Sequence, residues 1–346
     1  MEDAALQAAL ERFLTSRCAG PVRVEGLRPL AGGASREIYG FELHEQGRAP
    51  RALVLRLDPD SGRMHSDRGE EFALLAAARA AGVTVPVVHW LGEVADGLGA
   101  RFIVMDRVAG QAIARRLLRD DAFAATRNAL PGDLSRELAR IHAIDLGDER
   151  IRPLVARAPA GDDPKRFALA EIERYRQLLD LADHGHPRPA LRFGGRWLSR
   201  HAPSCARAAL VHGDFRVGNV LFDERGLTAV LDWELAHLGD PLEDLGWLSV
   251  RAWRFGRDEL AVGGLCTRDR FRELYEQAVG ARIDESAWRW WEIFGNWKWA
   301  IICVMQAASH EAGRFPNVEL ASLGRRTAEV EWEMIVLIEQ SHVGSS

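Results

Sequence analysis

The chain has 346 residues, of which 47% are hydrophobic, 27% are charged and 14 are proline. This length suits two lobes or domains, and the composition excludes a disordered, collagen-like or low-complexity chain. The 45 Lys and Arg residues against 50 Asp and Glu give a formal net charge of −5, so no basic field is available for nucleic acid or an anionic membrane. We therefore expect a globular protein that binds neither.

The cysteines and the amino terminus both favour a soluble cytoplasmic protein. The 4 cysteines are scattered without a C-x-x-C pair, which suggests neither a zinc knuckle nor a disulfide framework. Glu2 and Asp3 are acidic where a secretory signal carries positive charge, and the apolar residues that follow have helical spacing. The densest apolar run, Trp299–Met305, is far shorter than the roughly 20 residues that cross a bilayer.

The first third of the chain predicts a small antiparallel sheet with one inserted helix. Residues 52–58 alternate, with Leu53, Leu55 and Leu57 on one face and Val54 and Arg56 on the other, as in a half-buried strand. The expected elements in chain order are strands over 22–30 and 38–43 around a tight glycine loop, the strand over 52–58, a helix over 68–81, and strands over 85–94 and 101–105.

From Gly110 onward the pattern becomes mainly helical. Leu134, Leu138 and Ile141 follow a 3.6-residue stripe, and two long loops are expected over 156–165 and 183–204. One predicted helix near the carboxy terminus carries five tryptophans: Trp288, Trp290, Trp291, Trp297 and Trp299. We place the boundary between the two lobes at residue 106.

The clearest chemical signal is His212-Gly213-Asp214, followed by Asn219 and then by Asp232-Trp233-Glu234 after a β-type run. Metal-assisted phosphoryl transfer requires this set: one carboxylate deprotonates an attacking hydroxyl, while an amide oxygen and a second carboxylate hold Mg²⁺ on the nucleotide phosphates. A pair of turns whose Asp and Asn bond their own backbone is the alternative interpretation. The complete ordered set favours the catalytic one.

This segment resembles the catalytic and metal loops of the aminoglycoside phosphotransferase family, relatives of the protein kinases in which H-G-D replaces H-R-D and the second aspartate opens D-W-E. The resemblance implies Asp214 as the catalytic base, Asn219 and Asp232 as magnesium ligands, and Asp244 as a structural acid that braces the catalytic loop. It implies ATP as the phosphoryl donor, with GTP as an alternative.

The family has an α+β, two-lobed protein-kinase-like fold. The resemblance therefore implies an amino-terminal nucleotide-binding lobe over 1–106, built on a small antiparallel sheet with one helix. A mainly helical catalytic and acceptor-binding lobe would follow over 107–346.

The amino-terminal lobe should hold the nucleotide. Gly32, Gly33 and Ser35 lie at a hairpin tip, where missing side chains let backbone N–H groups approach phosphates. Val54 and Arg56 match the kinase pattern of a small apolar residue under the adenine and a cation on the phosphates. The kinase cation is lysine, whereas arginine is longer and forked. A solvent-facing strand arginine is the alternative.

Glu71 on the following helix is the candidate ion-pair partner of Arg56. Glu70 could take the same role, and a solvated charged helix face is the alternative to both. The segment around Asp106 and Val108 resembles the family's hinge. The resemblance implies that the Asp106 carbonyl and the Val108 N–H meet the adenine edge.

The tryptophan-rich helix has two interpretations. Trp290, Phe294 and Trp297 fall at helical spacing and other tryptophans fill a second face, so burial in the core is favoured. The chain has 11 tryptophans, and aromatic faces beside Lys298 could instead wall an acceptor pocket. Trp297 and Lys298 are therefore candidate acceptor residues.

Within the family, the chain looks most like the branch related to the kinase-like domains fused to acyl-CoA dehydrogenases. The segments that carry this likeness are Val54-Leu55-Arg56, Leu231-Asp232-Trp233-Glu234 and Trp297-Lys298. That branch is associated with phosphorylating hydroxyacyl thioesters. We therefore expect a phosphotransferase that moves the ATP γ-phosphoryl group to a hydroxyl of a small molecule, with a hydroxyacyl thioester as the candidate acceptor.

Other functions stay open. An antibiotic kinase would need acidic residues that converge on a polycation, and just Glu285 and Glu292 accompany the tryptophans. A nucleotide-binding pseudokinase would be expected to lack Asp214, Asn219 or Asp232, and all three are present. A protein kinase is disfavoured because the A-P-E segment is missing.

Overall fold

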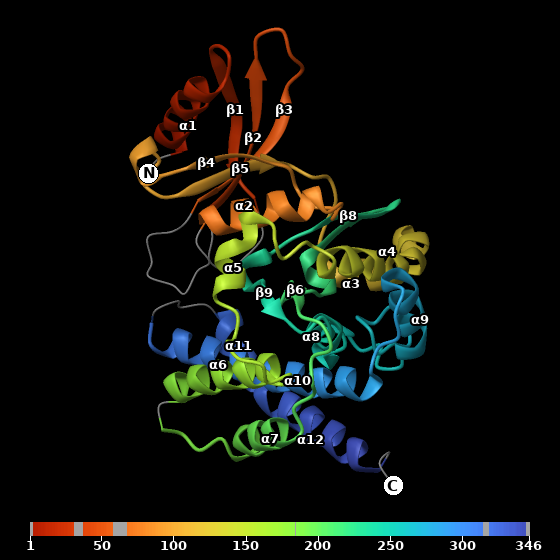
Figure 1. Cartoon of the computed structure of the whole chain (residues 1–346). Helices are drawn as coiled ribbons and strands as arrows, with labels where there is room; N and C mark the ends of the chain where they lie inside the picture. The colour runs from red at the N-terminus through yellow and green to blue at the C-terminus, as the bar shows by residue number, and fades with distance from the viewer. Residues whose placement is uncertain (1–2, 31–36, 58–67, 184, 314–317, 344–346) are drawn as a thin grey trace.

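The computed structural model describes residues 3–30, 37–57, 68–183, 185–313 and 318–343. These residues form a small lobe around a sheet and a larger helical lobe (Figure 1). The glycine loop that carries Gly32, Gly33 and Ser35 lies outside the described residues.

The sheet of the small lobe is antiparallel throughout, as predicted. Its strand order is β1 (Val22–Pro29), β2 (Glu37–Glu45), β3 (Arg51–Leu57), β5 (Phe102–Asp106) and β4 (Val88–Gly92). The alternation in β3 is confirmed, because Leu53, Leu55 and Leu57 are buried in one apolar cluster with residues of α1 (Asp3–Arg17). Strand β4 is shorter than expected, since Val83 and Val85 enter the core of the helical lobe before it begins.

Helix α2 (Arg68–Ala80) lies between the sheet and the helical lobe (Figure 1). Its buried residues Leu74, Ala77 and Ala78 belong to the same apolar cluster as residues of the helical lobe, and not to the cluster beneath the sheet. The hydrophobic core therefore does not divide at the predicted boundary.

Helix α10 (Glu285–Glu311) forms the centre of the helical lobe. The Asp284 side chain accepts hydrogen bonds from the N–H groups of Ser286 and Ala287 at 2.8 and 3.2 Å, so it caps the first turn. The helices that pack against α10 are α6 (Arg166–Ala182), α7 (Pro189–Arg200), α8 (Leu242–Leu248), α11 (Val318–Arg325) and α12 (Thr327–Val343).

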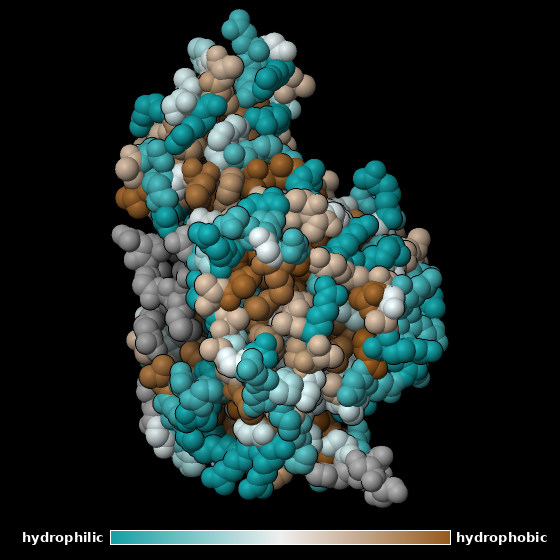
Figure 2. All heavy atoms as spheres, in the orientation of Figure 1, coloured by the Kyte–Doolittle hydropathy of each residue, from teal (hydrophilic) through white to brown (hydrophobic). Residues whose placement is uncertain are grey.

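The other α-helices of this lobe are α3 (Ala114–Arg119), α4 (Ala124–His142), α5 (Arg152–Ala156) and α9 (Arg268–Val279), of which α4 is the longest with 19 residues. Its strands are β6 (Ala209–Val211), β7 (Val220–Asp223), β8 (Gly226–Val230) and β9 (His237–Gly239). Among the residues that the structure describes, none of the helices combines the length and apolar character needed to cross a bilayer. Figure 2 shows a largely hydrophilic surface on this face, with apolar atoms gathered below the small lobe.

Helix α7 corrects the prediction of a continuous loop over 183–204. Pro189 occupies the first turn, where its missing N–H is tolerated. Two glycines within this helix are packing positions: a Cβ at Gly194 would lie 2.4 Å from the Met334 sulfur, and one at Gly195 would lie 3.1 Å from the Trp297 ring. Close approach to α12 and α10 therefore explains both glycines.

Candidate active site

The catalytic and metal loops lie side by side because the strands that flank them pair. Strand β6 leads into His212–Asp214 and pairs with β9, with Val211 opposite His237. Gly213 has a φ of +77°, and a Cβ there would lie 2.4 Å from the Leu235 carbonyl oxygen. Glycine is thus required both by the left-handed backbone and by contact with the metal loop.

Asp244 braces the catalytic loop, as the resemblance implied. Its buried carboxylate accepts the N–H groups of His212 at 2.8 Å and Gly213 at 2.9 Å, and it lies 3.0 Å from His142 Nε2. Burial alone would raise the pKa of Asp244, but the His142 partner and the backbone donors lower it below its usual value. The carboxylate is therefore a fixed anion behind the loop.

His212 is buried and uses both ring nitrogens in hydrogen bonds. Its Nδ1 accepts the N–H of Asp214 at 3.2 Å, and its Nε2 donates to the Leu231 carbonyl at 3.0 Å. Burial lowers the pKa of His212, which suits this neutral tautomer. The ring thereby joins the catalytic loop to the residue before Asp232.

Three donors orient the Asp214 carboxylate. Asn219 Nδ2 donates to Oδ2 at 2.6 Å, while Trp247 Nε1 and Arg216 Nε donate to Oδ1 at 2.6 and 3.1 Å. The side chain remains 14% exposed, so a substrate hydroxyl could reach it. Sequence reasoning missed Trp247 and Arg216; Arg216 stood inside the motif, whereas Trp247 gave no local signal.

Asn219 and Asp232 present oxygen atoms that suit a hard cation. Asn219 uses its amide nitrogen to bond Asp214, at 2.6 Å to Oδ2 and 3.0 Å to the backbone carbonyl, which leaves the amide oxygen for a metal. The Leu231 N–H donates to the Asn219 carbonyl at 2.8 Å, so the residue before Asp232 is tied to Asn219. Asp232 has a φ of +66° and a side chain that is 31% exposed. The amide oxygen of Asn219 and the carboxylate of Asp232 are the kind of oxygen ligands that Mg²⁺ prefers.

The predicted ion pair between Arg56 and Glu71 is present. It joins β3 to α2, and Arg68 pairs with the second oxygen of the same carboxylate. The other nitrogen of Arg56, Nη2, lies 3.8 Å from Asp232 Oδ1. Glu70 does not share this role, because both of its oxygens lie 2.7 Å from the Arg157 guanidinium.

Val54 and Asp106 lie on neighbouring strands, since β3 pairs with β5. The Asp106 N–H donates to the Val87 carbonyl at 2.9 Å, and its carboxylate lies 2.6 Å from His89 Nε2. A cavity of about 560 Å³ touches Asp106 and Val108, but its other lining residues are Arg79, Gly82, Val83, Thr84, Val85, Val87 and Thr228. Neither Arg56 nor Asp232 lines this cavity, so it does not include the residues predicted to hold the phosphates.

Trp297 and Lys298 are buried, which favours the core interpretation of their helix over the acceptor wall. Both are 1% exposed. The Trp297 indole donates to the Leu191 carbonyl at 2.8 Å, and Lys298 Nζ donates to the Gly213 carbonyl at 2.8 Å. The core interpretation of the helix holds for them, and Lys298 supports the catalytic loop from within.

A different aromatic group lies beside Asp214. Trp247, which bonds Asp214, has its ring 5.4 Å from that of Trp253, and the Trp253 ring is 4.9 Å from that of Trp299. The Arg216 guanidinium sits 4.9 Å from the Trp253 ring centre. Among the described residues, the buried indole N–H groups of Trp253 and Trp299 have no hydrogen-bond partner. The base thus has an aromatic and cationic neighbourhood.

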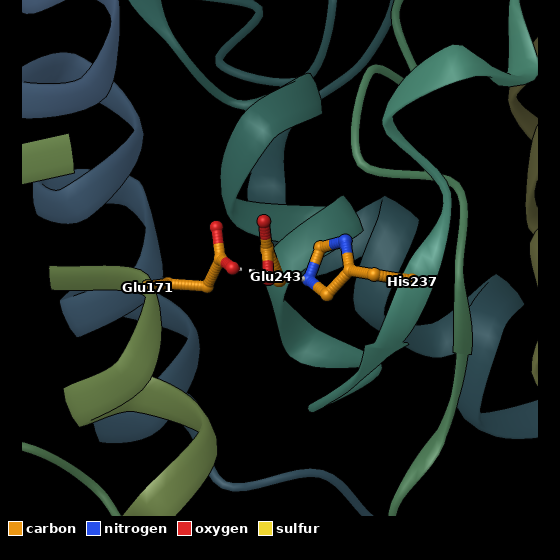
Figure 3. Close-up of side chains that lie close together, drawn as sticks. All are labelled: Glu171, His237 and Glu243. Carbon is orange, nitrogen blue, oxygen red and sulfur yellow. Dashed lines mark hydrogen bonds and ion pairs between the residues drawn. The ribbon is translucent and has the colours of Figure 1, made fainter. Parts of the chain in front are cut away.

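Glu171 on α6, His237 on β9 and Glu243 on α8 point toward one another and form a cluster (Figure 3). Their ligand atoms lie within 4.8 Å of one another, a spacing that could suit a metal. However, Arg174 lies 3.5 Å from Glu171 and Lys298 lies 3.5 Å from Glu243, so cations already oppose both carboxylates.

A protonated His237 adds a third positive charge beside the Glu171 and Glu243 carboxylates. Burial alone would lower the pKa of His237, but the Glu243 and Glu171 carboxylates outweigh it and raise the pKa to about 9. Burial likewise opposes the charge on Glu243, and His237 overcomes it and lowers the pKa of that carboxyl. The charges therefore favour an imidazolium bridging two carboxylates over a divalent ion.

The two lobes and the paired loops define a protein-kinase-like phosphotransferase fold. Residues 26–291 match the phosphotransferase enzyme family. The chain belongs to this family.

Curated relatives are acyl-CoA dehydrogenase family members. The chain is 32% identical to member 10 of Mus musculus over 251 residues, which cover 70% of this chain and 22% of that protein. It is 29% identical to member 11 of Gallus gallus over 254 residues, which cover 70% of this chain and 30% of that protein. The chain thus spans less than a third of the length of these relatives.

Solved structures share the fold over nearly the whole chain. A proposed aminoglycoside phosphotransferase from Ralstonia eutropha superposes with a TM-score of 0.70 at 24% identity, covering 94% of this chain and 97% of that one. Plasmodium vivax ethanolamine kinase gives a TM-score of 0.61 at 11% identity over 89% and 81% of the two chains. A mutant of aminoglycoside phosphotransferase APH(4)-Ia, in complex with AMP-PNP and hygromycin B, gives 0.55 at 20% identity over 93% and 97%.

Proposed function

We propose that this protein transfers the γ-phosphoryl group of ATP to a hydroxyl of a small molecule. The observation that carries the proposal is the joint placement of Asp214, Asn219 and Asp232 on two hydrogen-bonded loops. A carboxylate with three donors and partial exposure can orient a hydroxyl and accept its proton. A catalytically silent pseudokinase would be expected to lack Asp214, Asn219 or Asp232, and this chain has all three.

Asn219 and Asp232 would hold Mg²⁺ between the loops. The ion, when bound, supplies positive charge to the phosphates of the nucleotide. Arg56 adds a second cation, which Glu71 holds while Nη2 faces Asp232. Gly32, Gly33 and Ser35 would contact phosphates through their backbone, and Val54, Asp106 and Val108 would contact the adenine; GTP is the alternative nucleotide.

We further propose a hydroxyacyl thioester as the acceptor, in preference to an aminoglycoside. Two observations support this choice: the relatives carry acyl-CoA dehydrogenase names, and Arg216 and Trp247 both donate to the base, with the Trp253 ring against Arg216. A guanidinium beside the reacting group would repel a polycationic sugar, while aromatic rings and a cation suit an acyl chain and an anionic carrier.

Acceptor-dependent release of ADP from ATP tests the proposal. A panel of hydroxyacyl-CoA thioesters, ethanolamine and kanamycin-type aminoglycosides would be assayed with the wild-type protein and with Asp214→Asn. We expect a higher kcat/KM for a thioester, and we expect Asp214→Asn to lose transfer while it binds ATP normally. A kcat/KM that favours the aminoglycoside would overturn the acceptor alone, whereas full activity of Asp214→Asn would overturn the mechanism.

A further inference from the structure

We propose that Lys298, Glu243 and His237 form a buried chain of contacts that fixes the catalytic loop relative to the metal loop, with Lys298 as a positioning residue for Asp214. This proposal rests on the phosphoryl transfer proposed above. It gives a role to three charged side chains that the reaction itself does not use.

The chain of contacts starts at one loop and ends at the other. Lys298 Nζ donates to the Gly213 carbonyl at 2.8 Å and lies 3.5 Å from Glu243 Oε1. The second oxygen of Glu243 lies 3.1 Å from His237 Nε2, and His237 Nδ1 donates to the Leu235 carbonyl at 2.9 Å. Gly213 directly precedes Asp214, and Leu235 ends the short turn η5 (Trp233–Leu235) that directly follows Asp232. Three side chains therefore connect the two functional loops.

Lys298 also bears on Asp214 by a second route. Its ammonium lies 4.6 Å from the centre of the Trp247 ring, and the indole N–H of Trp247 donates to Asp214 Oδ1 at 2.6 Å. Lys298 thus holds the backbone of the catalytic loop directly, and it contacts the Trp247 ring whose N–H holds the Asp214 carboxylate.

The surroundings keep this chain charged. Burial alone would lower the pKa of Lys298, but Tyr175, Glu243 and Glu171 outweigh it and raise the pKa above its usual value. The charged and titratable groups around the chain are Glu171, Arg174 and Tyr175 on α6, Glu243 and Asp244 on α8, Lys298 on α10, and Asp214 on the catalytic loop.

Buried ion pairs can often be replaced by apolar groups of similar volume without loss of stability, so a contribution to stability does not by itself account for this network. Its specific contribution is directional: the Lys298 and His237 donors each point at a backbone carbonyl of a different loop. A packed apolar side chain could fill the same space but could not fix either carbonyl. We therefore expect these residues to affect turnover more than nucleotide binding.

The test compares Lys298→Met and Glu243→Gln with a matched control on the same helix, Trp290→Phe. The Trp290 indole is buried and donates to the Leu198 carbonyl at 3.2 Å, away from both loops. All variants would be studied where circular dichroism shows them folded. Glu243→Gln keeps the side-chain shape and serves if Lys298→Met does not fold.

Two readouts separate positioning from general damage. For Lys298→Met we expect kcat to fall at least about tenfold below that of the control, while the KM for ATP changes by less than about threefold. Amide hydrogen exchange, followed by mass spectrometry without substrate, should accelerate over 212–216 and 233–237 together. Glu243→Gln should act in the same direction, and its effect should not add to that of Lys298→Met.

The proposal is overturned if either loop keeps its wild-type exchange rate, or if kcat matches that of Trp290→Phe. It is also overturned if Zn²⁺ binds the nucleotide-free protein and His237→Gln abolishes that binding, because the cluster would then be a metal site. Absence of transfer in the wild-type protein would refute the proposed function, while the exchange experiment would still decide the positioning role.

Discussion

Replacing Glu71 with alanine removes a carboxylate that is 2% exposed and pairs with two guanidinium groups. Arg68 is itself 2% exposed, so it would keep a buried charge without this partner. Breaking a buried pair by removing one member costs about 3–5 kcal/mol. We expect the free energy of unfolding of Glu71→Ala to fall by roughly this amount.

Glu70→Ala is the matched control on the same helix. Glu70 pairs with Arg157, whose side chain is 58% exposed, and exposed pairs contribute about 0–1 kcal/mol. Urea denaturation followed by tryptophan fluorescence gives both values. ATP titration of folded protein should also show weaker binding for Glu71→Ala alone, because Arg56 loses its anchor.

A difference of less than about 1 kcal/mol between the two variants would refute the burial argument. Unchanged ATP affinity in Glu71→Ala would instead remove Arg56 from the nucleotide site.

Three further predictions concern metal, cation and pH. Asp232→Asn should weaken Mg²⁺-dependent ATP binding about tenfold by calorimetry, and equal binding with and without Mg²⁺ in the wild type would contradict the metal assignment. Arg56→Lys should restore ATP binding only partly relative to Arg56→Ala, because one ammonium cannot reproduce a fork that faces both Glu71 and Asp232. The pKa of His237 rises from 6.5 to about 9 on folding, so its stabilisation is full below pH 6.5 and lost as pH rises through 9. Denaturation should therefore show the stability gap between wild type and His237→Gln shrinking by roughly 3 kcal/mol across that window, and a gap independent of pH would exclude the imidazolium bridge.

Local patterns predicted much of the fold. The alternation of Leu53, Leu55 and Leu57 reports a strand because burial on one face follows directly from the two-residue period. The motif around Asp214 and Asp232 identified the loops because its residues are close in sequence as well as in space. The ion pair between Arg56 and Glu71 could be predicted for the same reason, because strand β3 and helix α2 are consecutive in the sequence.

Features that depend on distant contacts were not predictable. The loop predicted over 183–204 contains helix α7, in which Gly194 and Gly195 make room for Met334 and Trp297 from far along the chain. Trp247 bonds Asp214 from 33 residues away, and periodicity cannot show which way an indole N–H points. Lys298 was a candidate acceptor residue because it stands among tryptophans, whereas its partner, the Gly213 carbonyl, lies 85 residues earlier.

The location of α2 has a consequence for how the protein unfolds. This helix is encoded within the amino-terminal lobe, but Leu74, Ala77 and Ala78 pack in the core of the other one. A fragment that ends at residue 106 would leave this apolar face in water, at a cost of about 25 cal/mol for each Å² exposed. Heating should therefore melt both lobes in one cooperative transition, and protease cleavage between them should release no folded amino-terminal piece. We therefore expect two lobes that are distinct in shape to unfold as a single thermodynamic unit.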